Sequence, residues 1–130
     1  MPKPYALIVD DSPTSRDIFR TILEHGGFRV RTVADGNAAL ETVEAEPPDV
    51  VILDLFLPCV DGFEILERLR SNDRTRGIAV VCITAGATDE VRDRAEALGC
   101  DALAFKPEGP REVLRLVQGV LGRRVGGEDA

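Results

Sequence analysis

The chain has 130 residues, of which 44% are hydrophobic and 30% are charged, so it is long enough for one globular domain with its own core. Sixteen basic residues against 23 acidic ones give a formal net charge of −7, which opposes binding to nucleic-acid phosphates. Three cysteines without CxxC spacing argue against a disulfide framework or a zinc site, and no apolar run reaches the ~20 residues of a membrane span, so we expect a cytoplasmic domain that binds no membrane.

The first part of the chain contains two predicted strand–helix units. Residues 5–9 are an apolar run, which is typical of a parallel strand buried on both faces. A helix is predicted next, because Ser12 can cap it, Pro13 suits its first turn and two glycines can end it. Residues 28–33 largely alternate between apolar and polar side chains, which indicates a half-exposed edge strand, and a second helix is predicted around residues 38–43.

The rest of the chain contains three further units of the same kind. Apolar and β-branched residues predict strands at residues 50–55, 78–83 and 102–105. Helical spacing of apolar residues predicts helices around residues 63–69, 88–98 and 113–121. Five such units predict an α/β fold, a doubly wound five-stranded parallel sheet with helices on both faces. The half-exposed second strand fits the edge of the order 2-1-3-4-5, so we expect one domain over residues 4–121 and a flexible C-terminal tail over residues 122–130.

Polar side chains stand at the carboxyl ends of four predicted strands. Asp10 and Asp11 follow the first strand, Asp54 ends the third, Thr84 follows the fourth and Lys106 follows the fifth. Because ligands of open α/β sheets bind at this edge, where the strand order reverses, the five residues should converge on one crevice. Clustered carboxylates repel unless a cation neutralises them, and Mg²⁺ takes such oxygen ligands. A carboxylate can also be a nucleophile, so the set predicts transfer of a phosphoryl group to Asp54.

Each of these residues also has a purely structural explanation. Asp11 and Ser12 could simply cap a helix, Thr84 could favour a strand, and Lys106 could lie in solvent at a strand end. An unpaired carboxylate at Asp54, within an apolar strand, is costly and is harder to explain by structure alone. Their coincidence at one edge of the sheet therefore favours the chemical interpretation.

The segments around these residues resemble the receiver domain of bacterial response regulators. The matching stretches are LIVDDSPTSR, VVILDLFLPCVDGFEIL, VCITAGA and GCDALAFKP, in one register over residues 4–121. The resemblance implies a flavodoxin-like fold and a single-domain response regulator of two-component signalling. It further implies that Asp54 accepts a phosphoryl group from a histidine kinase or a histidine phosphotransfer protein, and that the protein then acts as a phosphorylation-dependent switch or phosphorelay shuttle.

The same resemblance assigns roles to individual residues. The implied ligands of a Mg²⁺ or Mn²⁺ ion are the carboxylates of Asp10, Asp11 and Asp54 and the backbone carbonyl of Phe56. The implied ligands of the phosphoryl oxygens are Thr84, Lys106 and the backbone amide of Ala85. The family also implies a cis peptide bond between Lys106 and Pro107.

Two features of the sequence bear on how such a switch would work. Family members usually carry Tyr or Phe three residues before the lysine, and here that residue is Leu103. We expect either that Leu103 repacks more modestly or that signalling relies on the loop and the fourth helix. In this family, the residues two positions after the acceptor aspartate and two positions after the threonine tune the loss of phosphate. Here they are Phe56 and Gly86, whose side chains cannot orient a hydrolytic water, so slow self-dephosphorylation is predicted.

Three alternatives remain open at the level of sequence. The chain could be a receiver-like module that binds proteins without phosphorylation, or a receiver fragment of a larger regulator or hybrid kinase. It could also be a Mg²⁺-dependent phosphatase, although the DxD element of such enzymes is absent after the first strand. We expect a switch that catalyses only its own phosphorylation and dephosphorylation, has an unknown downstream protein target and is a monomer or weak dimer.

Overall fold

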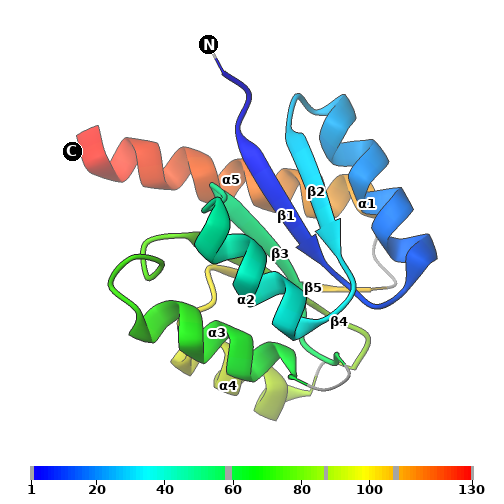
Figure 1. The fold of residues 1–130 in the computed structure, drawn as a ribbon, viewed down its shortest axis with the longest axis vertical. Helices are drawn as coiled ribbons and strands as arrows, with labels where there is room; N and C mark the ends of the chain where they lie inside the picture. Colours follow the sequence, from blue (N-terminus) through cyan, green and yellow to red (C-terminus); the bar gives the residue numbers. More distant parts are fainter. Residues whose placement is uncertain (1, 58–59, 87, 107–108, 130) are drawn as a thin grey trace.

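Five parallel strands form the centre of the structure, in the order β2-β1-β3-β4-β5 (Figure 1). This computed structural model describes residues 2–57, 60–86, 88–106 and 109–129. The strands are β1 (Tyr5–Val9), β2 (Arg29–Val33), β3 (Val50–Asp54), β4 (Ala79–Thr84) and β5 (Ala102–Phe105). The sheet class and the strand order predicted from the sequence are confirmed.

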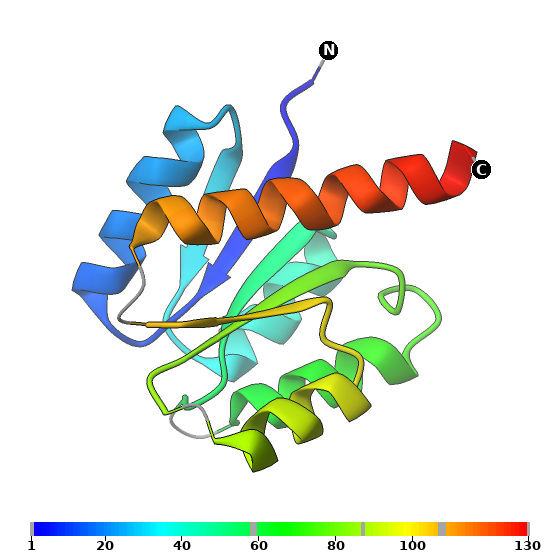
Figure 2. The same ribbon diagram turned by 180° about the vertical axis from the view of Figure 1, so that it is seen from behind.

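Helices cover both faces of the sheet, as the turned view also shows (Figure 2). They are α1 (Pro13–His25), α2 (Gly36–Ala45), α3 (Gly62–Ser71), α4 (Asp89–Ala97) and α5 (Pro110–Asp129). One hydrophobic cluster joins the sheet to α2, α3 and α4, and a second joins it to α1 and α5. Within β1, Leu7 belongs to the first cluster and Ile8 to the second, because successive side chains of a strand point to opposite faces. This two-sided burial explains why the central strands are almost continuously apolar.

Capping side chains fix where the helices begin, directly after the loops that follow the strands. The hydroxyl of Ser12 accepts a hydrogen bond from the amide of Ser15 at 3.2 Å, and the hydroxyl of Thr88 accepts one from Val91 at the same distance. Each cap satisfies an amide that has no partner within the helix. The loops after β1 and β4, which carry candidate site residues, are therefore held at both ends.

The observed boundaries differ most from the predicted ones at the C-terminus. Residues 122–129, expected to lie in a flexible tail, belong to α5, which ends at Asp129. No proline follows residue 110, so no residue there breaks the helix outright, although each of the three glycines in residues 122–129 costs it ~1 kcal/mol relative to alanine. The flexibility of residues 122–130 stays a prediction. In the described part of the chain, no helix combines the length and the apolar character needed to cross a bilayer.

Candidate functional site

The carboxyl ends of three neighbouring strands place the central residues of the candidate site. Asp10 follows β1 directly, and Asp54 is the last residue of β3, which pairs with β1. Thr84 ends β4, the other neighbour of β3. Because parallel strands end at the same edge, residues 30 or more positions apart in the sequence meet there.

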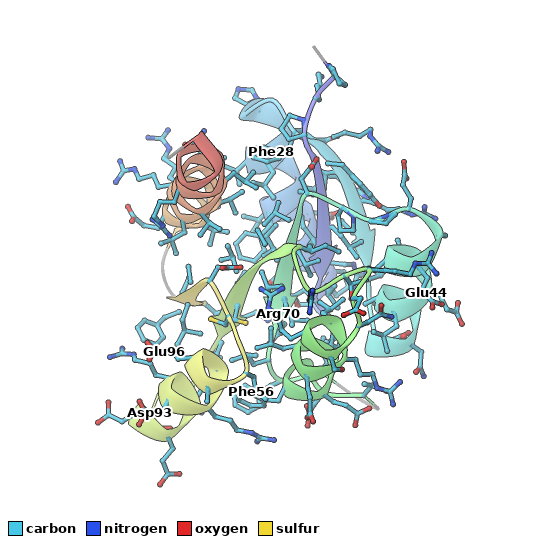
Figure 3. All side chains as sticks on the ribbon, turned by 90° about the vertical axis from the view of Figure 1, so that its left-hand side faces the viewer. Phe28, Glu44, Phe56, Arg70, Asp93 and Glu96 are labelled. Carbon is cyan, nitrogen blue, oxygen red and sulfur yellow. The ribbon has the colours of Figure 1, made fainter. Side chains whose placement is uncertain are left out.

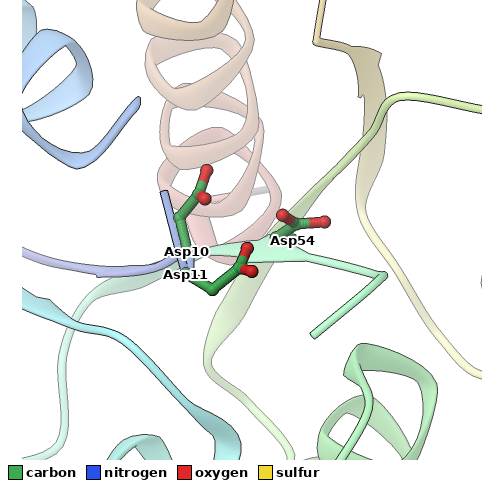
Figure 4. A group of neighbouring side chains, drawn as sticks. All are labelled: Asp10, Asp11 and Asp54. Atoms are coloured by element: carbon green, nitrogen blue, oxygen red, sulfur yellow. The ribbon is translucent and has the colours of Figure 1, made fainter. Parts of the chain in front are cut away.

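Three carboxylates gather at this edge, as Figure 4 shows. One carboxylate oxygen each from Asp10, Asp11 and Asp54 lies within 4.8 Å of the other two. Asp10 and Asp54 are buried, whereas Asp11 is exposed. Oδ2 of Asp10 is buried and has no hydrogen-bond partner among the described residues. A buried carboxylate oxygen requires a partner, and a hard divalent cation held by these three carboxylates would supply one, so the residues fit a Mg²⁺ site.

Lys106 supplies a positive charge within the same group. Its Nζ lies 3.0 Å from Oδ2 of Asp54 and 3.2 Å from Oδ1 of Asp10, which is 96 positions away in the sequence. Burial lowers the pKa of Lys106, but the hydrogen bonds and charges of Asp54 and Asp10 outweigh this effect and raise it above its usual value. Lys106 is therefore a permanent cation facing the Asp54 carboxylate.

Burial also acts on Asp54 and raises its pKa above the ordinary value. The amide of Phe56 and the ammonium of Lys106 oppose this effect, whereas the charge of Asp10 adds to it. An ionised Asp54 is thus held in a site that only partly compensates its charge. A second positive charge at this place would favour the ionised, nucleophilic form.

The loop after β3 is held close to the Asp54 carboxylate. Oδ1 of Asp54 accepts a hydrogen bond from the amide of Phe56 at 3.0 Å, and the amide of Gly62 donates to the carbonyl of Leu55 at 3.1 Å. A Cβ at position 62 would overlap the Asp54 carbonyl and the Leu55 backbone, so only glycine permits this approach. No role was predicted for Gly62, although it follows Asp61 in one of the segments that carry the resemblance.

Arg16 is a second residue that the sequence analysis did not single out. Its Nη1 donates a hydrogen bond to the backbone carbonyl of Asp10 at 2.8 Å, and the amide of Ser12 donates to Oδ1 of Asp10 at 2.9 Å. These two contacts hold the loop that carries the first two carboxylates. Arg16 ends the stretch LIVDDSPTSR that carries the resemblance, but nothing in its spacing indicates a role, and only the structure shows its contact with Asp10.

The hydroxyl of Thr84 is turned toward the loop between β4 and α4. It accepts a hydrogen bond from the amide of Gly86 at 3.2 Å and lies at the same distance from the Gly86 carbonyl, to which it can donate. Ala85, between them, is exposed. Leu103 is half-buried and packs against the cluster shared with α4. Pro107 lies outside the described residues, so the predicted cis peptide bond is not tested.

Comparisons with known proteins agree with this arrangement. A model of the response regulator receiver domain family matches residues 6–118. An uncharacterized 14.6 kDa protein encoded in the sodA1 3′ region of Leptolyngbya boryana is 36% identical over 112 residues, which cover 86% of either chain. The response regulator Rre1 of Synechocystis sp. is 34% identical over 95% of this chain but only 54% of its own length, and the polar-differentiation response regulator DivK of Brucella anthropi is 30% identical over 94% and 98%. The chain thus spans about half the length of several curated relatives and nearly all of another.

Solved structures give the same fold. The chemotaxis protein CheY4 of Vibrio cholerae superposes with a TM-score of 0.86 at 29% identity, over 91% of this chain and 98% of the other. The receiver domain of the sensor histidine kinase PA1611 of Pseudomonas aeruginosa has a TM-score of 0.84 at 28% identity, over 92% and 98%. That structure holds a magnesium ion coordinated in its active-site cleft.

Proposed function

Because the chain belongs to the family of response regulator receiver domains, we propose that it is a single-domain response regulator that accepts a phosphoryl group on Asp54. The donor would be a phosphohistidine of a histidine kinase or a histidine phosphotransfer protein. The observation that carries the proposal is the ammonium of Lys106, which lies 3.0 Å from Oδ2 of Asp54 at the carboxylate cluster that Asp54 forms with Asp10 and Asp11. Receiver domains are signalling modules of the switch type rather than classical enzymes.

The carboxylates of Asp10, Asp11 and Asp54 and the backbone carbonyl of Phe56 would hold a Mg²⁺ or Mn²⁺ ion. When bound, such an ion neutralises charge on the transferred phosphoryl group and orients its oxygens. The unpartnered Oδ2 of Asp10 supports the assignment.

The proposed reaction uses the ionised carboxylate of Asp54 as its nucleophile. A carboxylate oxygen forms a bond to phosphorus, the bond from phosphorus to the donor imidazole nitrogen breaks, and its electron pair stays on that nitrogen. Lys106 exchanges its contact with Asp54 for a phosphoryl oxygen and so keeps its charge next to the developing acyl phosphate. The amide of Ala85 and the hydroxyl of Thr84 bind further phosphoryl oxygens.

The hydroxyl of Thr84 links this reaction to a change of shape. To reach a phosphoryl oxygen it has to leave the backbone of Gly86, with which it interacts in the free protein. The loop before α4 then loses a local constraint and takes a second arrangement. A downstream protein that distinguishes the two arrangements would read the signal, and we place both proteins in the cytoplasm, with this one as a monomer or weak dimer.

The test is the intact mass of the protein after incubation with acetyl phosphate, with and without Mg²⁺. We expect one phosphoryl adduct that requires Mg²⁺, that Asp54→Asn abolishes, and that Asp73→Asn, at an exposed position on another loop, leaves unchanged. No adduct, also with a phosphohistidine donor, would favour a receiver-like module that binds proteins without phosphorylation. Steady release of phosphate from a small phosphate ester would instead indicate a phosphatase.

A further inference from the structure

The backbone of Phe56 lies in the candidate site, whereas its side chain is exposed to solvent. Its amide donates a hydrogen bond to Oδ1 of Asp54 at 3.0 Å, and its carbonyl is a proposed metal ligand. Its side chain is 53% exposed, although most large apolar side chains in the described part of the chain are buried. The peptide group that faces Asp54 therefore needs support from elsewhere, because the loop residue itself is not enclosed by the core.

That support comes from α3. The ring of Phe56 meets the ring of Phe63, in the first turn of α3, with centroids 6.3 Å apart and planes at 84°. This edge-to-face arrangement is attractive because the positive edge of one ring meets the negative face of the other. Phe63 is only 5% exposed, so it gives the exposed ring a fixed neighbour.

A cation on α4 completes the arrangement. The guanidinium carbon of Arg94 lies 4.1 Å from the centroid of the Phe63 ring, within the range of a cation–π interaction. The three side chains, here called the aromatic–arginine stack, thus connect the loop after β3, the start of α3 and the last turn of α4. Figure 3 shows Phe56 at the end of the molecule where α3 and α4 lie.

We propose that Phe63 and Arg94 are positioning residues, which hold the peptide group of Phe56 against Asp54 and couple it to α4. The metal-binding part of this inference rests on the proposed function. The coupling is reciprocal by thermodynamic linkage. If binding of an ion at Asp54 requires the peptide group of Phe56 in its observed position, a substitution of Arg94 that displaces this peptide group must change the affinity for the ion. With leucine at position 103, the stack also offers a route from the acceptor to α4 that does not pass through β5.

The test combines two measurements on the full chain. The amide signal of Phe56 in ¹H–¹⁵N NMR spectra of the metal-free protein reports the position of the peptide. The dissociation constant for Mn²⁺, measured by electron paramagnetic resonance, reports the metal site. The variants are Arg94→Gln and Phe63→Leu, and Arg94→Lys is the rescue, since an ammonium also attracts a ring face. Arg92→Gln removes the same charge from an exposed residue of α4, and thermal unfolding shows which variants are folded.

We expect Arg94→Gln to shift the Phe56 amide signal and to weaken Mn²⁺ binding by up to about five-fold, with partial recovery in Arg94→Lys. The direction of the change in Mn²⁺ affinity distinguishes a positioning role from a simple effect of charge. Loss of a positive charge alone would strengthen the binding of a cation, as we expect at most for Arg92→Gln. Phe63→Leu removes the shared ring and should shift the same signal in a folded protein.

Two results would overturn the proposal. The first leaves the proposed function intact, and the second contradicts the proposed function as well. If the wild type binds Mn²⁺ and gains a phosphoryl group while Arg94→Gln and Arg92→Gln behave alike in both measurements, the positioning role is wrong and the proposed function stands. If the wild type neither binds Mn²⁺ nor gains a phosphoryl group, the proposed function fails and the coupling to metal binding fails with it.

Discussion

At the scale of single residues, the carboxylate of Asp54 shows that the site is arranged for something other than stability of the free protein. Lys106 lies 3.0 Å away, and yet burial keeps the pKa of Asp54 above its ordinary value of 3.8. A group whose pKa is higher in the folded than in the unfolded protein binds its proton more tightly when folded. Ionisation of Asp54 therefore favours the unfolded chain.

Replacement of this charge by a neutral group of the same shape should stabilise the protein. We expect Asp54→Asn to raise the free energy of unfolding at pH 7.5 in the absence of divalent cations. The gain should be complete above the folded-state pKa of Asp54 and should disappear below pH 3.8, where the wild-type carboxyl is protonated in both states. Urea unfolding at several pH values, in the presence of EDTA, measures the difference. A less stable variant at neutral pH would show that the pair with Lys106 outweighs the cost of burial.

Phe56 leads to a prediction about the lifetime of the phosphorylated form. Its ring is exposed at the edge of the site and cannot orient a water molecule for attack on an acyl phosphate. Phe56→Asn introduces an amide that can, so we expect loss of the phosphoryl group to become about ten-fold faster or more. Phe56→Leu is the apolar control and should leave the lifetime long. The decay of the adduct is followed by intact mass after removal of acetyl phosphate. Equal decay rates for Phe56→Asn and Phe56→Leu would contradict the prediction.

The residues that carry charge were predictable from the sequence, whereas those that support them were not. Asp10, Asp54 and Lys106 stand at strand ends, and the rule for parallel sheets was enough to bring them together. Gly62 and Arg16 each act on a backbone carbonyl. A side chain at position 62 would overlap the carbonyl of Asp54, and Arg16 donates a hydrogen bond to the carbonyl of Asp10. Such contacts depend on the path of a loop, which no periodicity in the sequence encodes.

At the scale of secondary-structure elements, Arg70 ties α3 to the far end of the sheet. Its guanidinium donates to the carbonyls of Gly99 at 2.9 Å and Ile78 at 2.6 Å, and it pairs with the carboxylate of Asp101 at 3.0 Å. The same carboxylate oxygen accepts a hydrogen bond from the amide of Val80 at 2.8 Å. One side chain therefore joins α3, the start of β4 and the turn before β5, opposite the candidate site.

Loss of this side chain should be costly because it leaves partly buried carbonyls without donors and removes the partner of Asp101. We expect Arg70→Ala to lower the free energy of unfolding by about 2–3 kcal/mol. Arg68→Ala is the matched control on the same helix, since Arg68 forms an exposed ion pair with Glu64, and its loss should cost at most about 0.5 kcal/mol. Urea unfolding of the two variants gives the comparison, and equal effects would contradict the role assigned to Arg70.

Sequence patterns predicted the ends of some elements well and the end of α5 poorly. β1 and β5 begin and end at the predicted residues, because the apolar run of β1 lies between Pro4 and Asp10 and that of β5 lies between Asp101 and Lys106. The end of α5 was placed too early, at Leu121, because only the apolar spacing was used as a guide. Residues 122–129 include a single large apolar residue, Val125, so apolar spacing cannot predict where this helix ends.

At the scale of the whole molecule, the fold brings part of the negative charge of the chain, whose net charge is −7, to one point at the candidate site. Three carboxylates share a space of 4.8 Å, and the described residues bring one ammonium to Asp10 and Asp54 there. A divalent cation that binds only the folded chain must stabilise it. We expect Mg²⁺ at about ten times its dissociation constant to raise the free energy of unfolding by about 1.4 kcal/mol, and EDTA to reverse the effect.

The variants of this measurement separate a specific site from a general effect of salt. Asp11→Asn alters an exposed carboxylate of the cluster and should weaken the stabilisation by Mg²⁺. Asp17→Asn alters an exposed carboxylate on α1 and should leave it unchanged. Equal stabilisation of both variants, observed by thermal unfolding across a Mg²⁺ titration, would indicate screening of the net charge rather than binding.

The contact between Asp10 and Lys106 has a consequence for the protein during its synthesis. The two residues are 96 positions apart, so the ammonium is still missing when most of the sheet has left the ribosome. A nascent or truncated chain that stops before β5 has its carboxylates but lacks the charge that faces them. If Asp54 accepts a phosphoryl group as proposed, such a chain lacks the cation that would face the transferred group. The pair of Asp10 and Lys106 thus cannot form before β5 has been synthesised, so this contact is among the later ones that the sheet gains.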